Sequence, residues 1–171
     1  MYIIFTNRYY ILEFLKKKKK LEFVYCEKNS YAEIYCKKNT INYKNYVSKQ
    51  ESYKMLIKSV KKKIILNGYK FIIPEKIIKR FRYIPINIHP SLLPDYKGQL
   101  IVKKMFKDKP KNIGATVHYI TKIVDEGPIL SQAKIKFDKK ITKIDLYQIL
   151  FKLEVVAFKK FFNGKVLKVF S

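Results

Sequence analysis

Cysteine and tryptophan are scarce in this sequence, and the scarcity of cysteine excludes some classes of protein. The chain has no tryptophan and only two cysteines, Cys26 and Cys36, among its 171 residues. Two cysteines do not form a disulfide framework, and no side chains near them have the spacing of metal ligands. We therefore expect two free thiols in a reducing, cytoplasmic environment, and no bound metal ion.

Long apolar runs are also missing. The longest apolar segments, such as KIILNGYKFII, are interrupted by lysine, asparagine or glycine well short of a membrane span. The first residues, MYIIFT, resemble a strand and show no signal-peptide pattern. Hydrophobic residues still make up 48% of the chain, which excludes a disordered protein and suits one domain with its own core. We predict a single domain over residues 1–171 that does not enter a membrane.

Acidic residues are few. The 13 Asp and Glu stand against 38 Lys and Arg, which gives a formal net charge of +25. A charge of this size is typical of proteins that bind nucleic acid. The excess, however, is almost all lysine and is spread along the whole chain, together with abundant Ile, Asn, Tyr and Phe. AT-rich codons encode these residues, so the pattern favours codon bias, and we expect no nucleic-acid partner.

Short β-branched runs alternate with segments of helical character. The predicted strands are MYIIFT, LEFVYC, INYKNYV, KIILNG, YIPINIH, ATVHYITKIV, PILSQAKIKF and a final VLKVFS. The predicted helices are residues 9–19, SYAEIYCKKN, residues 50–61, PEKIIKRF, a stretch ending near Lys107, and residues 142–163. This alternation predicts an α/β fold, with a mostly parallel sheet covered by helices on both faces. Sites in such folds lie at the carboxyl ends of the strands.

Candidate catalytic residues follow two of these strands. His89 ends YIPINIH, and Asn87 lies two residues earlier, so both side chains leave the strand on the same side. Asp125 lies in the turn IVDEGP after another strand. An amide and an imidazole can stabilise an oxyanion, and a carboxylate beside the imidazole can act in proton transfer. Taken singly, each residue also fits a structural role in a loop or turn, so residue type alone leaves both possibilities open.

Two segments resemble the signatures of folate-dependent formyltransferases. These are INIHPSLLPDYKG and IGATVHYITKIVDEGPILSQAKI, and the distance from His89 to Asp125 is the one that this family keeps. The resemblance is clear from about Lys63 to Ile135. It implies a Rossmann-like formyltransferase fold, with Asn87, His89 and Asp125 as the catalytic residues.

The resemblance also implies a substrate pair. The formyl group of 10-formyltetrahydrofolate would pass to the amine of 5'-phosphoribosylglycinamide, in purine (IMP) biosynthesis, without a metal ion. By the same resemblance, IILNGYKFIIPEKII would hold the folate through the backbone of Lys70, Phe71, Ile72 and Ile73, together with Asn87. His118 would brace the loop of Asp125, and Gly98 and Gly127 would allow their loops to turn.

The sequence departs from the family around the acceptor. The family binds the substrate phosphate with a glycine-rich loop after the first strand, whereas FTNRYYILEF contains no glycine. Asn7 and Arg8 are the candidates to bind the phosphate with their side chains instead. Val102 stands where the family often has a histidine. Glu154 is a candidate for holding the glycinamide, and a surface glutamate is the alternative interpretation.

Other functions remain open from the sequence alone. Methionyl-tRNA formyl transfer would suit the positive charge, but that family has a further tRNA-binding domain. Formyltetrahydrofolate hydrolysis would suit GATVHY and DEGPI, but a second histidine usually stands in place of Pro90. A degenerate relic, or a module that binds folate or nucleic acid without turnover, would suit the missing glycine-rich loop. We expect a monomer or a weak homodimer.

Overall fold

The computed structural model describes residues 1–164, so the predicted final strand VLKVFS lies outside the described residues. The chain divides into two compact units, residues 1–87 and residues 88–171, and each is considered by itself. Within residues 1–164, no helix has the length and apolar character that a membrane crossing requires. The expectation of a single domain stays a prediction.

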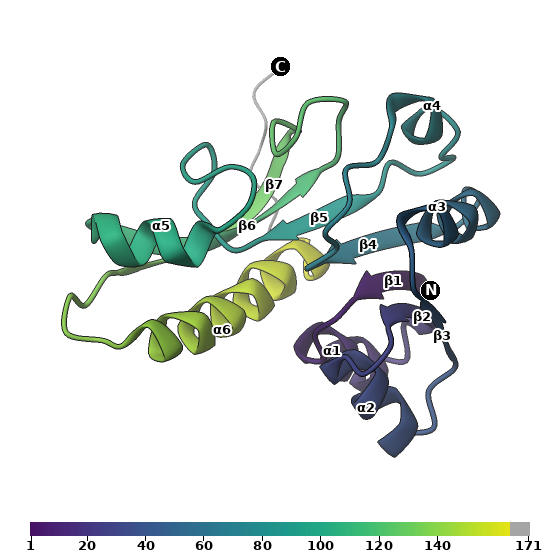
Figure 1. Cartoon of the computed structure of the whole chain (residues 1–171), viewed down its shortest axis with the longest axis horizontal. Coiled ribbons are helices and arrows are strands. Elements are labelled where there is room, and N and C mark those ends of the chain that lie inside the picture. Colours follow the sequence, from purple (N-terminus) through teal and green to yellow (C-terminus); the bar gives the residue numbers. More distant parts are fainter. Residues whose placement is uncertain (165–171) are drawn as a thin grey trace. The chain divides into compact units, whose positions relative to one another are not determined.

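The first unit is built around parallel strands (Figure 1). Its strands are β1 (Tyr2–Thr6), β2 (Leu21–Glu27), β3 (Tyr43–Tyr46) and β4 (Lys63–Asn67). They lie in the order β3-β2-β1-β4. The neighbouring strands β1 and β4 are apolar along most of their length because both of their faces are covered. Ile4 and Phe5 on β1 and Ile65 on β4 are almost fully buried.

Helices connect these strands. They are α1 (Tyr10–Lys17), α2 (Tyr31–Lys38), α3 (Lys49–Lys58) and the short α4 (Glu75–Ile78). Figure 1 shows α1 and α2 on one face of the strands and α3 on the other. The start of α2 follows directly from the sequence, because the Ser30 hydroxyl accepts a hydrogen bond from the Glu33 backbone at 3.2 Å. Ser48 caps α3 in the same way through Glu51.

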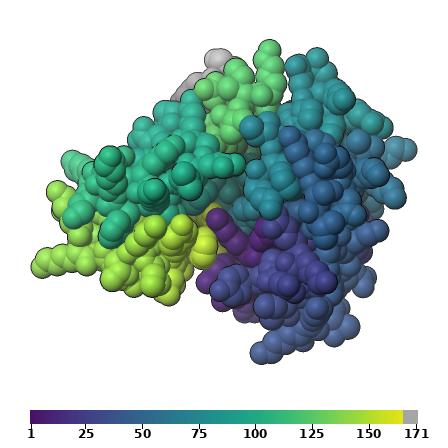
Figure 2. All heavy atoms as spheres, in the orientation of Figure 1, coloured from purple at the N-terminus to yellow at the C-terminus, as the bar shows by residue number. Residues whose placement is uncertain are grey.

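The second unit contains β5 (Ile86–His89), which begins in the first unit, α5 (Ile101–Asp108), β6 (Asn112–Tyr119), β7 (Ile129–Lys136) and α6 (Lys143–Phe162). β6 and β7 form an antiparallel pair, against which α6 packs. Helices α5 and α6 contact each other and form much of this unit's visible surface in Figure 2. A capping box between Thr142 and Asp145 begins α6, and Gly164, at φ 75°, follows its end.

The structure corrects three of the expected boundaries. The helix predicted from PEKIIKRF ends at Ile78, because the chain then turns and the Arg82 backbone bonds to the Val60 carbonyl at 2.8 Å. The strand predicted from YIPINIH begins only at Ile86, after Pro85, which cannot donate a ladder hydrogen bond. The strand predicted from ATVHYITKIV ends at Tyr119, and its last apolar residues lie exposed in a loop.

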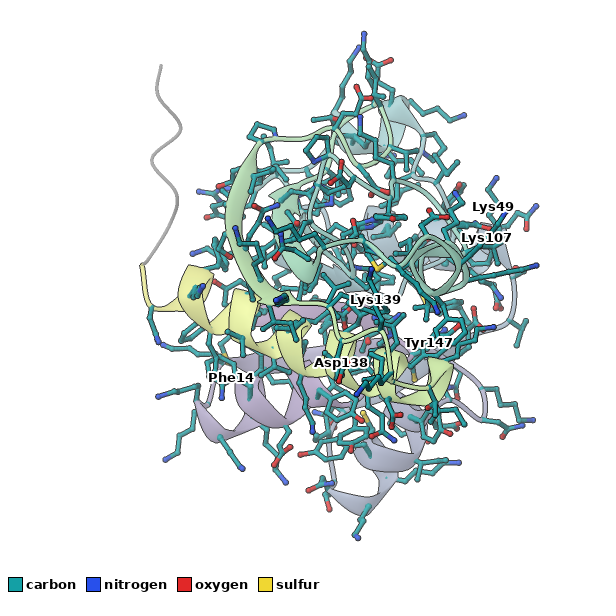
Figure 3. All side chains as sticks on the ribbon, turned by 90° about the vertical axis from the view of Figure 1, so that its left-hand side faces the viewer. Phe14, Lys49, Lys107, Asp138, Lys139 and Tyr147 are labelled. Atoms are coloured by element: carbon teal, nitrogen blue, oxygen red, sulfur yellow. The ribbon has the colours of Figure 1, made fainter. Side chains whose placement is uncertain are left out.

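Lysine side chains lie at the surface, whereas both cysteine thiols are buried. Lysines project outward from helices of both units, for example Lys49 on α3 and Lys107 on α5 (Figure 3). Cys26 and Cys36 are free thiols with no exposed surface, and burial raises their pKa values to about 11 and about 12.

Candidate active site

The carboxyl end of β5 carries the first candidate residues. Asn87 is the last residue of the first unit, and His89 stands two positions later on the same strand. Alternation along a strand places positions 87 and 89 on the same side of β5. His89 is only 5% exposed, so its ring nitrogens need partners inside the protein.

Both ring nitrogens of His89 face oxygen atoms. Nε2 lies 2.9 Å from the main-chain carbonyl of Tyr96, and Nδ1 lies 3.4 Å from Oδ2 of Asp125. A neutral imidazole carries one N–H, whereas an imidazolium carries two. The ring of His89 is thus held between the Tyr96 carbonyl and the Asp125 carboxylate.

Asp125 is held by the backbone as well as by the histidines. Its side chain is 8% exposed, and its backbone has a φ of 58°, a left-handed value that few residues other than glycine adopt. The Gly98 backbone N–H donates to Asp125 Oδ2 at 2.8 Å. The carboxylate oxygen that faces His89 is thus the one fixed by the loop that follows His89.

His118 completes this cluster from β6. Its Nε2 lies 3.6 Å from Asp125 Oδ1, and its ring is nearly perpendicular to that of His89, with the ring centroids 6.3 Å apart. Nδ1 lies 2.9 Å from the Tyr119 carbonyl, to which it donates. Burial lowers the pKa of His118, while the Tyr119 carbonyl and Asp125 act in the opposite direction. His118 therefore lies beside the Asp125 loop, and its bracing role stays a prediction.

Gly98 and Gly127 are needed for different reasons. Gly98 has a φ of 79°, so it allows its loop to turn, as expected. Gly127 does not have a left-handed backbone. A Cβ atom there would lie 1.7 Å from the Tyr119 carbonyl oxygen, so this glycine permits the loop of Asp125 to pass close to the end of β6.

The predicted folate-binding stretch, Lys70 to Ile73, belongs to the first unit. Lys70 forms an ion pair with Glu27 at 2.8 Å, and Phe71 packs edge-on against the ring of Tyr69. The Tyr53 hydroxyl donates to the Ile72 carbonyl. Ile72 is 62% exposed and Ile73 is buried. The stretch is anchored at its ends and exposes an apolar side chain between them.

The loop after β1 has a defined conformation without glycine. The Asn7 side-chain oxygen accepts from the Glu27 backbone N–H at 2.9 Å, and the Thr6 hydroxyl accepts from the Arg8 backbone N–H at 3.0 Å. The Arg8 guanidinium lies along Gly68, where a Cβ would approach Nε to 3.1 Å. Asn7 therefore joins β1 to β2 through its oxygen, and Arg8 is the cationic side chain of this loop.

Two residues considered for the acceptor lie in the second unit. Glu154 is 2% exposed on α6, which contradicts the interpretation of it as a surface glutamate. Val102 is buried on α5. No group of three or more His, Cys, Asp or Glu side chains within residues 1–164 is arranged to hold a metal ion.

Sequence inspection missed the side chains that anchor the loop after His89. Thr116 on β6 and Gln132 on β7 bond to its backbone, at Ser91 and Leu93. The signal was present in GATVHY, where strand alternation places Gly114, Thr116 and His118 on one face.

The sequence matches a known protein family, and the fold matches solved structures. Residues 10–161 match the model of a family described as formyl transferase. The chain belongs to this formyl transferase family. A solved phosphoribosylglycinamide formyltransferase from Streptococcus pneumoniae TIGR4 superimposes with a TM-score of 0.84 and 17% identity, over 95% of this chain and 97% of that one. The predicted α/β, Rossmann-like formyltransferase fold is therefore confirmed.

Relatives within the formyl transferase family have different activities. The chain is 38% identical over 91 residues to a phosphoribosylglycinamide formyltransferase of Bacillus subtilis (strain 168). The matched stretch covers 53% of this chain and 47% of the relative. Over 69 residues, it is 39% identical to the mitochondrial formyltetrahydrofolate deformylase 2 of Arabidopsis thaliana, covering 40% of this chain and 21% of the relative. The chain thus matches about half the length, or less, of these curated relatives.

Proposed function

We propose that this formyltransferase is a phosphoribosylglycinamide formyltransferase, which passes the formyl group of 10-formyltetrahydrofolate to the amine of 5'-phosphoribosylglycinamide in purine biosynthesis. The observation that carries the proposal is the His89 and Asp125 pair, with the Gly98 N–H on the same carboxylate oxygen. The similarity to phosphoribosylglycinamide formyltransferases in sequence and fold supports this acceptor.

The proposed reaction uses side chains of the protein and no metal ion. The amine attacks the formyl carbon, a new C–N bond forms, and the electrons of the C=O bond move to its oxygen. The Asn87 amide and an N–H of His89 donate to this oxyanion, and each such donor contributes about 3 kcal/mol in comparable reactions. The C–N bond to the folate then breaks as the folate nitrogen takes up a proton.

His89 and Asp125 are proposed to act in the proton transfer, with the Asp125 carboxylate balancing a positive charge on His89. Asp125 stabilises the imidazolium at Nδ1, and through a water molecule it helps to move the amine proton to the leaving nitrogen. Both nitrogens of His89 face protein oxygens at present, so a contact with the Tyr96 carbonyl or with Asp125 is exchanged when the substrate oxygen binds. Because Asp125 acts at Nδ1 in this proposal, the contact that is exchanged is the one between Nε2 and the Tyr96 carbonyl.

Residues for binding each of the two substrates are also proposed. The backbone from Lys70 to Ile73 and the Asn87 side chain are proposed to hold the folate. Arg8 is proposed to hold the acceptor phosphate with Asn7, whose side-chain nitrogen is available to a ligand while its oxygen stays on the Glu27 backbone. Glu154 is proposed to hold the glycinamide. We place the enzyme in the cytoplasm, as a monomer or a weak homodimer.

The test is to mix the purified protein with 10-formyltetrahydrofolate, with or without phosphoribosylglycinamide, and to follow tetrahydrofolate release. We expect release only with the acceptor, and a loss of roughly a hundredfold or more in kcat for His89→Ala. Urea unfolding of both proteins serves to show that the variant is folded.

The same assay separates the alternative activities. Release at equal rates without the acceptor would replace the proposal by formyltetrahydrofolate hydrolysis, the activity named for the Arabidopsis relative. Release only with methionyl-tRNA would assign that acceptor instead. A folded protein without release under any of these conditions would support a non-catalytic relic.

A further inference from the structure

The loop from Pro90 to Gly98 governs the contacts of both charged groups in the candidate site. Its Tyr96 carbonyl accepts from His89 Nε2, and its Gly98 N–H donates to Asp125 Oδ2. The conformation of this backbone therefore sets where the imidazole and the carboxylate lie. This loop has no regular secondary structure, so contacts with other segments must fix its conformation.

A single buried hydroxyl forms two of the contacts that fix it and a third contact with a side chain on β7. The Thr116 hydroxyl donates to the Ser91 carbonyl at 2.6 Å and accepts from the Leu93 N–H at 3.1 Å. It also accepts from the Gln132 side-chain amide at 2.9 Å. A hydroxyl has one donor and two acceptor positions, so every hydrogen-bonding position of Thr116 is used. Thr116 is fully buried, so water cannot replace a lost partner without rearrangement.

Gln132 and Ser91 extend this network. The Gln132 amide also donates to the Leu93 carbonyl at 3.0 Å, so β6 and β7 hold both main-chain groups of one loop residue. The Ser91 hydroxyl donates to the Asp95 carbonyl at 2.6 Å, which closes the loop just before Tyr96. The chain of contacts runs without a gap from Thr116 to the carbonyl beside His89.

The same face of β6 contributes at two further positions. A Cβ on Gly114 would lie 2.1 Å from the Ala133 carbonyl oxygen of β7 and 2.4 Å from the Leu92 side chain, so the missing side chain leaves room for both the neighbouring strand and this loop residue. His118, two positions after Thr116, approaches Asp125. One strand face thus receives the loop, fixes its backbone and approaches the carboxylate.

We propose that Thr116 is a positioning residue for formyl transfer: with Gln132, it fixes the Pro90–Gly98 loop and thereby the relative position of His89 and Asp125. The formyl-transfer part of this inference rests on the proposed function. The positioning part rests on the contacts alone. A misplacement of about 1 Å at a reacting group costs on the order of a hundredfold in rate.

The experiment compares Thr116→Val and Thr116→Ser with a control, Ser131→Ala. Valine keeps the shape of threonine and removes the hydroxyl, whereas serine keeps the hydroxyl. Ser131 is also a buried hydroxyl, on β7, but it donates to the Ala157 carbonyl of α6 and has no bond to the loop. The control separates a general loss of stability from a loss of loop position.

We expect Thr116→Val to lower kcat by roughly ten- to a hundredfold, with little change in the KM of either substrate. Thr116→Ser should recover most of the rate, and Ser131→Ala should lose stability but keep its kcat. The proposal is wrong if Thr116→Val keeps its kcat, if serine does not recover the rate, or if Ser131→Ala is equally impaired. Should Thr116→Val not fold, Gln132→Leu is measured against the same criteria.

Two measurements decide the positioning role even if the chain transfers no formyl group. Hydrogen exchange over residues 90–98 should accelerate in Thr116→Val and stay unchanged in Ser131→Ala. The chain has only two histidines, so the ring ¹⁵N resonances of His89 can be assigned with His89→Ala and should move only in Thr116→Val. If both signals stay unchanged in Thr116→Val, the positioning role is refuted independently of the activity.

Discussion

Gly98 donates its backbone N–H to the carboxylate oxygen of Asp125 that also lies nearest to His89. The loop after the histidine therefore holds the aspartate that is proposed to act on the same histidine. A neutral hydrogen-bond donor fixes the carboxylate without cancelling its charge. The charge of Asp125 remains available to an imidazolium at Nδ1.

Removing this charge while keeping the side-chain shape tests the role of Asp125. In Asp125→Asn, the amide oxygen can still accept from Gly98, so we expect a folded protein. The imidazolium of His89 loses its counterion, and kcat should fall by roughly a hundredfold or more. Asp138→Asn is the matched control, because it makes the same change at an exposed aspartate whose side-chain oxygen accepts from the Lys140 backbone, away from the loop. Equal rates in the wild type and Asp125→Asn would rule out the proposed role.

The two loop glycines should differ in their tolerance of alanine. Gly98→Ala meets no atom within 4 Å, and its cost is the left-handed backbone, roughly 1–2 kcal/mol of the free energy of unfolding. Gly127→Ala brings a methyl group onto the Tyr119 carbonyl and should cost about 3 kcal/mol or more. Urea unfolding of both variants checks this order. A Gly127→Ala protein as stable as Gly98→Ala would contradict the close approach.

The features that could be predicted are those whose causes lie within a few residues. Ser30 and Thr142 mark the starts of their helices because each side chain caps a backbone group three residues later. The α/β class followed from the alternation of strand and helix patterns. The resemblance of the two motifs to the family also indicated His89 and Asp125, whose Nδ1 and Oδ2 atoms lie 3.4 Å apart. Their catalytic roles stay a prediction.

The remaining features depend on contacts that are distant in the sequence. On α6, the apolar residues Ile144 and Tyr147 are exposed, whereas Leu146 and Leu150 are buried. This helix is apolar on more than one side, so the period alone does not identify the face that packs on β6 and β7. The contact between the Tyr96 carbonyl and His89 could not be predicted either, because a backbone group gives no signal in the sequence.

Stability should depend on pH through His118. Burial lowers the pKa of this histidine below the 6.5 of the unfolded chain, so the unfolded state binds more protons around and below that pH. Its contribution is complete above pH 6.5 and is lost as the pH falls from there towards the folded pKa. Urea midpoints at pH 7.5 and pH 5.5 should differ more for the wild type than for His118→Gln. An equal pH dependence in the two proteins would contradict a buried neutral His118.

Two tyrosines of the first unit should respond in opposite ways to loss of the hydroxyl. Tyr46 is 1% exposed, and its hydroxyl bonds to no group among residues 1–164, so Tyr46→Phe should leave stability unchanged or raise it. The Tyr69 hydroxyl shares a 2.7 Å hydrogen bond with Ser52, so Tyr69→Phe should cost about 1 kcal/mol. Thermal unfolding distinguishes the two. A Tyr46→Phe protein less stable than Tyr69→Phe would mean that the Tyr46 hydroxyl has a partner.

The burial of both cysteines has a practical consequence for following the Pro90–Gly98 loop. Thiolates are the species that alkylating reagents attack, and both native thiols are enclosed, with pKa values raised to about 11 and about 12. A maleimide dye should therefore leave Cys26 and Cys36 unmodified in the folded protein. A single cysteine introduced at exposed Gln99 becomes a selective attachment point, so fluorescence can report motion beside the Pro90–Gly98 loop without removal of a native cysteine.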